Sequence, residues 1–540
     1  MFFCLIYKKK IAMDLQKIEA IYEEVSYHKK PDNSSVEEWQ YALRRQFALK
    51  QKFSVTNIGR DTVFSDFRVK NPETGNSYKV AIRSYDNSTN FCSCPDFKTN
   101  QLGTCKHIEA VLLMIKKRPE LEEKLKKGYQ PSYTSVYVHY YGQRTVKIRI
   151  GTEKYEEFKT WAKKYFDGNT LKPSAYYEFE KLIEEASAIH PGFRCYPDAL
   201  DLIIEARDKK ERIQKLEQKY STEINSSVFS ELVKTNLFPY QKEGVRFASA
   251  AGRAILADDM GLGKTLQAIT SAELMKKEFG IDSVLIVCPT SLKYQWKSEI
   301  EKFTSSTCRV IEGNALVREQ QYKGNEFYKI LSYNALNNDV AIINELETDL
   351  VILDEAQRIK NYKTKISQNV KRLKSRFAFV LTGTPLENKL EELYSVVQFV
   401  DPFGLGPFYR FLSEHQIKNE TGKVVGYKNL NEIGNALSDI MIRRTKAQVL
   451  KQLPERLDKV LFVPMTERQN DIHDENQSGV SKLVNKWKRF GFLNEKDRQR
   501  LMIMLNTMRM ACDSTFVIDQ QSRHRSEEHT SELQSRQVNS

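Results

Sequence analysis

Residues 253–265 read Arg253-Ala254-Ile255-Leu256-Ala257-Asp258-Asp259-Met260-Gly261-Leu262-Gly263-Lys264-Thr265, and this stretch decides the fold. Its first four residues favour a buried strand, a glycine-rich turn follows, and a helix is expected after the turn. Such a turn between strand and helix directs backbone N–H groups at phosphate oxygens, where the helix N-terminus also favours negative charge. The stretch therefore predicts a phosphate-binding turn at the end of a strand.

Two side chains of the turn have defined roles in this hypothesis. Lys264 would reach the β- and γ-phosphates of a bound nucleotide, and the Thr265 hydroxyl would ligate Mg²⁺. The strict pattern G-x-x-x-x-G-K-T has glycine where this chain has Asp258, so the turn alone is an incomplete match. The predicted nucleotide contacts from this segment are Asp259, Met260, Gly261, Leu262, Gly263, Lys264, Thr265 and Leu266.

A second apolar run, residues 350–353, ends in Asp354-Glu355-Ala356-Gln357. A buried strand would deliver Asp354 to the magnesium shell and place Glu355 to orient or deprotonate an attacking water. An isolated Asp-Glu is more often a surface pair. Here it follows a strand about ninety residues after a strand–turn–helix, so we predict that Lys264, Asp354 and Glu355 form a catalytic set.

Short apolar runs alternate with amphipathic helices from about residue 238 onward. The runs are 253–256, 283–288, 350–353 and 377–381. Continuous apolar strands separated by helices indicate a parallel sheet covered on both faces. We therefore expect the α/β class for this part of the chain.

Three of the eight cysteines lie within fourteen residues, in the pattern C-x-C-x10-C-x-H. Three thiolates and one imidazole form the closed tetrahedral set of a structural zinc site. The Cys-x-Cys pair would lie at a strand end or turn, and the Cys-x-His pair at a helix start. The alternative is three ordinary buried cysteines and a core histidine. The predicted zinc ligands are Cys92, Cys94, Cys105 and His107.

This pattern resembles the SWIM zinc finger, a family associated with binding DNA or protein rather than with catalysis. The other cysteines are scattered, which together with the absence of a secretory signal favours a reducing cytosol over disulfides.

Five further blocks occur in a recognisable order along the chain. They are Leu237-Phe238-Pro239-Tyr240-Gln241-Lys242-Glu243-Gly244, Cys288-Pro289-Thr290-Ser291-Leu292 with Trp296, Ser332-Tyr333-Asn334, Leu381-Thr382-Gly383-Thr384-Pro385-Leu386-Glu387-Asn388, and Arg443-Arg444-Thr445-Lys446 with Leu453-Pro454. In order and spacing these blocks resemble the Swi/Snf family of helicase superfamily two over about residues 237–515, and with the preceding finger they resemble bacterial SWIM-containing Swi/Snf proteins. Asp258 fits that family's turn, D-E-M-G-x-G-K-T, whereas Asp259 departs from its Glu and Gln357 from the His of D-E-A-H.

The resemblance implies a RecA-like lobe and ATP-driven translocation on double-stranded DNA, with Mg²⁺ at the ATP and DNA-bound proteins as further partners. It implies that Gln241 reads adenine. It implies that Thr382, Gly383 and Thr384 couple the state of the ATP to DNA contact. It also implies a cytoplasmic, nucleoid-associated protein.

We expect six segments in the chain. They are an extension before a second candidate start at Met13 (1–12), a zinc-binding α+β module (13–130), a connector of a hairpin and helices (131–228), a first RecA-like ATP-binding lobe (229–459), the start of a helical insertion (460–520) and a non-native tail (521–540). Both candidate starts remain open. The tyrosines and lysines of residues 153–220 could touch DNA or form a solvated face.

Composition places few limits on function. The 540 residues carry a formal charge of +14, which favours a polyanion partner such as DNA, although a lysine-rich proteome explains it equally well. No apolar run approaches the roughly 20 residues that a membrane helix needs, so we expect no membrane partner.

The family's second motor lobe is not recognisable in the sequence. After Gly434 the chain has only Gly479 and Gly491, and it lacks a Q-x-x-G-R-x-x-R block. Residues 525–535 match the in-frame translation of a common sequencing adapter, so we expect a gene fragment joined to an artefact. The alternative function is therefore a catalytically incomplete module that binds zinc, ATP and nucleic acid.

Overall fold

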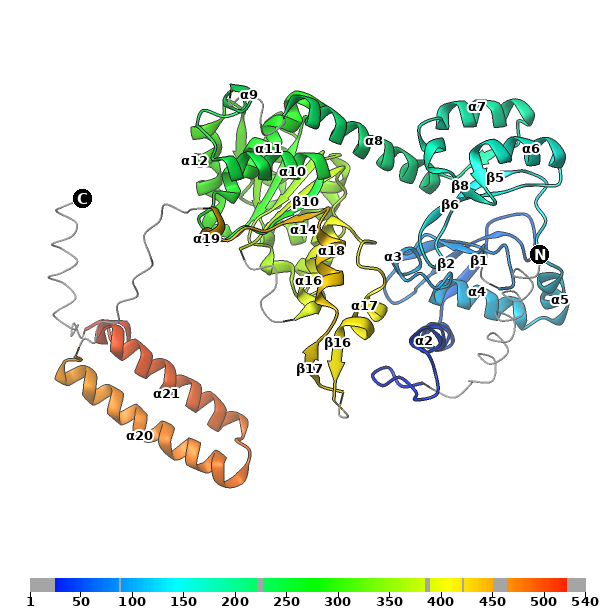
Figure 1. Cartoon of the computed structure of the whole chain (residues 1–540). Helices are drawn as coiled ribbons and strands as arrows, with labels where there is room; N and C mark the ends of the chain where they lie inside the picture. Colours follow the sequence, from blue (N-terminus) through cyan, green and yellow to red (C-terminus); the bar gives the residue numbers. More distant parts are fainter. Residues whose placement is uncertain are drawn as a thin grey trace. The chain divides into compact units, whose positions relative to one another are not determined.

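The computed structural model describes residues 25–86, 89–220, 227–383, 389–419, 422–449 and 464–521, drawn in colour in Figure 1. The chain divides into two units, residues 1–451 and 452–540. The expected extension (1–12) and the adapter-like segment (525–535) lie outside the described residues.

Seven strands form the central sheet of the first unit, in the order β12-β13-β11-β14-β15-β10-β18. Every neighbouring pair is parallel. All side chains of β11, β14 and β15 are buried, as a parallel sheet covered on both faces requires. The expected α/β class is confirmed. The strands are β10 (Arg253–Leu256), β11 (Val284–Cys288), β12 (Cys308–Val310), β13 (Tyr328–Ser332), β14 (Leu350–Leu353), β15 (Phe377–Leu381) and β18 (Met441–Ile442).

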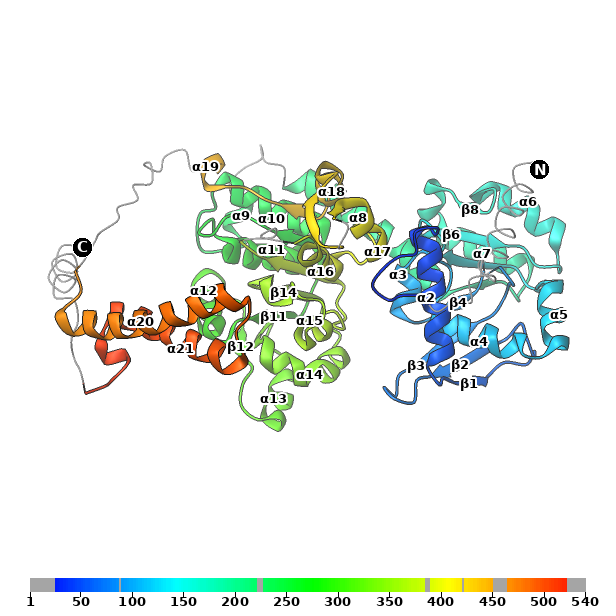
Figure 2. The ribbon, with the colours of Figure 1, turned by 90° about the horizontal axis from the view of Figure 1, so that it is seen from below.

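Alternate residues of each central strand enter different cores. In β10, Ala254 and Leu256 pack with one core, and Ile255 packs with the other. Figure 2 shows α10 and α11 on one side of the sheet and α14 and α15 on the other. The covering helices are α10 (Pro239–Ala251), α11 (Lys264–Phe279), α12 (Lys293–Phe303), α14 (Tyr333–Glu345), α15 (Lys365–Val370) and α16 (Leu390–Val400).

Two smaller sheets precede this domain. An antiparallel sheet of four strands packs with α4 (Lys106–Lys116), which in turn packs with α2 (Val36–Lys50); a five-stranded sheet has the order β7-β8-β6-β5-β9. One continuous hydrophobic core, from Val63 to Ile203, joins both sheets. The strands are β1 (Ser54–Asn57), β2 (Asp66–Lys70), β3 (Ser77–Ala81), β4 (Phe91–Cys92), β5 (Ser135–His139), β6 (Thr145–Arg149), β7 (Phe166–Asp167), β8 (Thr170–Leu171) and β9 (Arg194–Cys195).

Helices connect and cover these sheets. The expected hairpin is present, because β5 and β6 pair antiparallel around residues 140–144. Long polar α8 follows the five-stranded sheet and leads toward the seven-stranded domain. The helices are α3 (Pro95–Thr99), α5 (Pro119–Lys127), α6 (Tyr155–Tyr165), α7 (Phe179–Ile189) and α8 (Pro197–Lys219).

The second unit is a helical hairpin of α20 (Glu467–Phe490) and α21 (Glu495–Asp513). Thr466 and Gln469 form a reciprocal capping box at the start of α20. Gly491, with φ 74°, ends that helix in the left-handed region that favours glycine. The hairpin lies within the segment expected to be helical.

A buried ion pair closes the edge of the parallel sheet. Asp258 and Arg444 each lie two residues beyond the paired positions Leu256 and Ile442. Arg444 donates from its backbone N and Nε to Asp258 Oδ1, both at 3.0 Å, and from Nη2 to Oδ2 at 2.6 Å. Gln267 Nε2 also donates to Oδ2 at 3.0 Å. Asp258, which departs from the strict glycine pattern, is thus the fully buried anchor of β18.

This pair predicts a large effect of Asp258→Ala on stability. Breaking a buried pair costs about 3–5 kcal/mol; the Arg444 guanidinium would keep only the half-exposed Glu243, 3.2 Å away, as a carboxylate partner. We expect a lower thermal midpoint and faster hydrogen exchange in peptides that carry β10 and β18. Glu301→Ala, which removes the partner of exposed Lys297, is the control and should change little. Unchanged protection of β18 in Asp258→Ala would contradict the assigned role.

Candidate functional site

A cavity of about 590 Å³ opens at the carboxyl ends of β10 and β14. It brings together the two halves predicted from the sequence. Eight of the predicted residues line it: Met260, Gly261, Gly263, Lys264, Thr265, Leu266, Asp354 and Glu355. The predicted contacts Gln241, Asp259 and Leu262 lie next to it, in or behind the turn.

The turn itself depends on its glycines. Gly261 and Gly263 have φ values of 84° and 72°, in the left-handed region. Leu262, between them, is fully buried and anchors the turn. Lys264 begins α11, and its Nζ donates to the carbonyl oxygens of Asp258 at 2.7 Å and Asp259 at 3.1 Å. Burial lowers the pKa of Lys264, although the acids around the turn oppose that shift.

Asp354 is held by three groups. Trp296 Nε1 donates to Asp354 Oδ2 at 2.8 Å, and the backbone N of Glu355 donates to Oδ1 at 2.9 Å. The Tyr333 hydroxyl donates to the Asp354 carbonyl oxygen at 2.8 Å. Burial raises the pKa of Asp354, and the Trp296 hydrogen bond opposes the shift. The sequence had marked Trp296 and Tyr333 only as parts of motifs, and no local pattern links them to Asp354.

Glu355 combines two unusual features. Its φ of 50° places a non-glycine residue in the left-handed region, which costs about 1–3 kcal/mol and is typical of functional sites. Its Oε2 is buried without a hydrogen-bond partner among the described residues. An unpartnered carboxylate oxygen beside a phosphate-type turn fits a water or ligand that approaches from the cavity.

Gln241 supports the turn from α10. Its Oε1 accepts from the backbone N of Phe238 at 3.0 Å, and its Nε2 donates to the Leu262 carbonyl oxygen at 3.3 Å. A Cβ at Gly263 would lie 2.5 Å from Gln241 Nε2 and would displace that amide, while the φ of 72° itself favours glycine there. Asp259 lies behind the turn, where its Oδ2 accepts from the backbone N of Lys446 at 3.1 Å.

The predicted coupling segment starts beside the same turn. The backbone N of Thr382 donates to the Leu256 carbonyl oxygen at 3.1 Å. A Cβ at Gly383 would lie 3.0 Å from Met260 Cγ and 3.8 Å from Lys264 Nζ. Thr384 lies outside the described residues.

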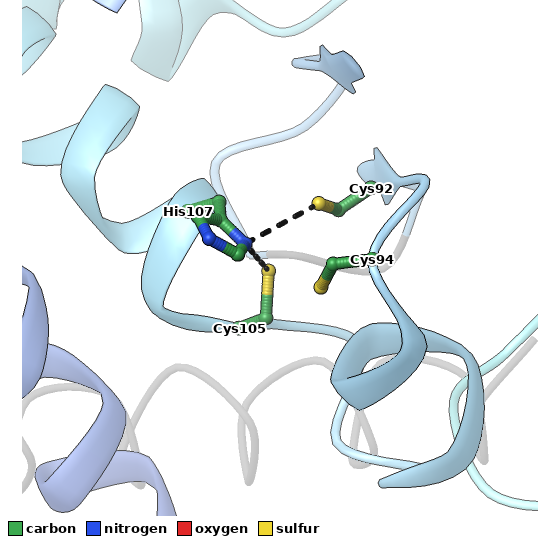
Figure 3. Close-up of side chains that lie close together, drawn as sticks. All are labelled: Cys92, Cys94, Cys105 and His107. Atoms are coloured by element: carbon green, nitrogen blue, oxygen red, sulfur yellow. Dashed lines mark hydrogen bonds between the residues drawn. The ribbon is translucent and has the colours of Figure 1, made fainter. Parts of the chain in front are cut away.

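The four predicted zinc ligands converge in the four-stranded module. Figure 3 shows the cysteine and histidine side chains turned toward one another. Their ligand atoms all lie within 4.8 Å of one another and all four residues are buried; no other cluster of three or more ligand-type residues occurs in the described ranges. Cys92 ends β4, Cys94 precedes α3, and Cys105 and His107 flank the start of α4, as the spacing predicted.

The chemistry of the cluster suits a soft divalent metal. His107 Nδ1 lies 3.8 Å from both Cys92 Sγ and Cys105 Sγ. Hydrogen bonds from Cys105 and Cys92 hold the pKa of the Cys94 thiol well below its usual value, while burial raises the pKa of the Cys92 and Cys105 thiols. A metal ion would remove this conflict, because it binds all three sulfurs as thiolates.

Comparison with known proteins identifies both regions. The SNF2-related domain matches residues 240–517, and the SWIM zinc finger matches residues 77–116. The chain is 34% identical over 251 residues to an uncharacterized ATP-dependent helicase of Mycoplasma genitalium, covering 45% of this chain and 24% of that protein. It is 32% identical over 258 residues to the putative ATP-dependent helicase/translocase YwqA of Bacillus subtilis, covering 45% and 27%.

Two further comparisons extend this set. The chain is 35% identical over 243 residues to the human DNA annealing helicase and endonuclease ZRANB3, covering 42% of this chain and 22% of that protein. The solved SWI2/SNF2 ATPase core domain of Sulfolobus solfataricus is 28% identical, covers 53% of this chain and 58% of that one, and gives a TM-score of 0.37. The chain thus spans about a quarter of the length of these curated relatives.

The SNF2-related match covers just over half of the 540 residues. It includes the phosphate-type turn, the Asp354–Glu355 pair and the helical hairpin. The chain therefore belongs to the SNF2-related family and carries a SWIM zinc finger ahead of its SNF2-related domain.

Proposed function

We propose that this chain is the ATP-binding part of a motor that uses ATP hydrolysis to move along double-stranded DNA. The observation that carries the proposal is the single cavity that Lys264, Thr265, Asp354 and Glu355 line together. The family match and relatives named as ATP-dependent helicases support it.

Each residue of the cavity would have a distinct role in ATP binding or hydrolysis. The Lys264 ammonium would exchange its two backbone carbonyl partners for the β- and γ-phosphates. The Thr265 hydroxyl and the Asp354 carboxylate would hold Mg²⁺, which neutralises phosphate charge when bound. Glu355 would accept a hydrogen bond or a proton from the attacking water at its unpartnered Oε2. Gln241 would read adenine by giving up one of its present partners.

DNA is the proposed partner because of the family and the charge. Relatives are named as DNA repair and recombination protein RAD54B and DNA annealing helicase and endonuclease ZRANB3, and the formal charge of +14 favours a polyanion. Proteins on the DNA would be displaced or remodelled. We place the protein at the nucleoid in the cytoplasm. Among the described helices, none has the length and apolar composition to cross a membrane.

A narrower function is the alternative: a module that binds zinc, ATP and nucleic acid without appreciable turnover. In the related motors a second lobe supplies arginine side chains to the ATP. In the described ranges, one parallel sheet, β12 to β18, carries a phosphate-type turn. Arginine fingers in other nucleotide hydrolases contribute roughly 10³–10⁵-fold in rate, so turnover by residues 1–540 separates the two functions.

Substitutions at Lys264 and Glu355 should have different effects. Lys264→Ala should abolish binding of a fluorescent ATP analogue, because the cation that faces the phosphates is lost. Glu355→Gln should bind it as tightly as the unsubstituted chain but lose any turnover. Phosphate release with and without duplex DNA, with Lys264→Ala as background, measures turnover. Tight binding by Lys264→Ala would refute the site, and robust DNA-stimulated release by residues 1–540 would exclude the narrower function.

Trp296→Phe should weaken the magnesium site without leaving a large cavity in the hydrophobic core. Phenylalanine keeps one six-membered aromatic ring at this position, but the N–H that lowers the pKa of Asp354 is lost. The pKa of this carboxyl, already raised by burial, should rise further, and more of it will be protonated as pH falls. We expect the Mg²⁺ concentration for half-maximal ATP binding to rise about tenfold, and more at pH 6 than at pH 8. Trp161→Phe, outside the site, is the control; a pH-independent effect would contradict this role.

The SWIM module should contain one structural zinc ion per chain. Cys94→Ser should lose it and raise hydrogen exchange across residues 77–116, because binding of metal and folding are coupled. Metal analysis after purification without chelators measures the stoichiometry. Cys195→Ser, whose sulfur lies outside the cluster, is the matched control. Stoichiometric zinc in Cys94→Ser would remove this residue from the ligand set.

A further inference from the structure

A second cavity, of about 470 Å³, lies between the four-stranded and the five-stranded sheets. Its walls come from β2, β3 and α3 on one side and from β5, β6, β9 and the start of α8 on the other. Because both sheets share one hydrophobic core, this cavity is built into the module. None of the zinc ligands or ATP-site residues lines it, and its volume falls within the range of about 300–1,000 Å³ that is typical of ligand sites.

One wall of this inter-sheet cavity is aromatic. Phe97 and Tyr140 lie with ring centroids 5.3 Å apart, and Phe91 lies 6.2 Å from Tyr140. Tyr137 and Tyr196 line the cavity from neighbouring elements. The Tyr140 hydroxyl donates to Asp198 Oδ2 at 2.9 Å, which fixes the ring. Such rigid rings favour a planar ligand that can stack.

The rest of the lining is predominantly basic. Five lysines and arginines but only three aspartates contribute to it. Two of those carboxylates already have partners, because Asp66 pairs with Lys79 at 2.8 Å and with Arg83 at 2.6 Å, while Asp198 accepts from Tyr140. The lining therefore has a positive excess that favours an anionic ligand.

Arg149 has hydrogen-bonding capacity left over. Its Nε is buried without a partner in the described part of the chain. Its Nη2 reaches Ser135 Oγ only at 3.4 Å, a weak contact. A purely apolar ligand would leave this donor unsatisfied, whereas a phosphate group suits a guanidinium.

We propose that the inter-sheet cavity binds a single nucleotide unit. Its base would stack on the ring of Tyr137, and its phosphate would lie at Arg149. The unit is an unpaired nucleotide of a DNA strand or a free mononucleotide, which present the same chemistry. The site is separate from the ATP cavity and does not depend on the proposed motor activity. It would allow the zinc-finger module to recognise single-stranded ends or gaps.

The test uses residues 1–540 carrying Lys264→Ala, which silences the ATP site. Fluorescence anisotropy measures the binding of a labelled oligo-dT of twelve nucleotides. In a second measurement, the same strand carrying 5-iodouracil is photo-crosslinked to the protein, and the crosslinked peptides are identified. Tyr137→Leu should weaken binding about 5- to 150-fold, the contribution of one stacked base. Tyr137→Phe keeps the ring and should bind normally. Arg149→Gln should also weaken binding, whereas Tyr155→Leu, an exposed tyrosine elsewhere, should not.

Competition by dTMP identifies the source of the nucleotide. If dTMP prevents crosslinking of the oligonucleotide to the peptides that line the cavity, the site binds a free mononucleotide. If crosslinks to these peptides persist in the presence of dTMP, the site binds a nucleotide within a strand. Either result supports the site. The zinc content of each variant shows whether the module is folded. If Tyr137→Leu loses zinc, the binding affinity of Arg149→Gln and the positions of the crosslinks test the proposal instead. Unchanged binding in Arg149→Gln together with crosslinks only outside residues 66–201 would overturn the proposal.

Discussion

Parallel pairing of β10, β15 and β14 brings three segments of the candidate nucleotide site to one edge of the sheet. Leu256 pairs with Leu381, and Leu353 pairs with Val380, so the three strands end at the same edge of the sheet. The turn that begins at Asp258, the Thr382–Gly383 segment and the Asp354–Glu355 pair follow directly from those ends. A shift of one residue in either pairing would reverse which side chains enter each core. The apolar residues on both faces of the sheet therefore hold these three segments in place as well as the fold.

Within this frame, the carboxylates of Asp258 and Glu355 differ in how far the surrounding residues satisfy them. Asp258 is surrounded by Arg444 and Gln267, so it cannot serve the nucleotide. Glu355, by contrast, has a strained backbone and an unpartnered oxygen. The phosphate-type turn thus contains a rigid anchor that ties β18 to it, whereas the strained residue follows β14 and lines the same cavity.

The zinc-finger module is stabilised in a different way from the parallel sheet. Its sheets are small, and the four candidate ligands buried at the junction of β4, α3 and α4 would crosslink these elements through a bound zinc ion. The hydrophobic core extends past the cysteine–histidine cluster into the five-stranded sheet. The zinc-finger sheet and the five-stranded sheet therefore fold against each other. The inter-sheet cavity exists only because of that joint core. A ligand-binding role for the module therefore depends on two segments that look separate along the chain.

Sequence alone determined what depends on local pattern. The apolar runs predicted four of the seven strands of the parallel sheet, the glycine-rich turn predicted the phosphate-type loop, and the spacing of Cys92 to His107 predicted a metal-ligand cluster, because each motif is local in sequence. Only the tertiary structure decided what depends on distant partners. Arg444 meets Asp258 across 186 residues, and Trp296 meets Asp354 across 58. Side-chain contacts of this kind arise from sheet order and helix packing, which no local period encodes, and the aromatic and basic lining of the inter-sheet cavity is assembled in the same way.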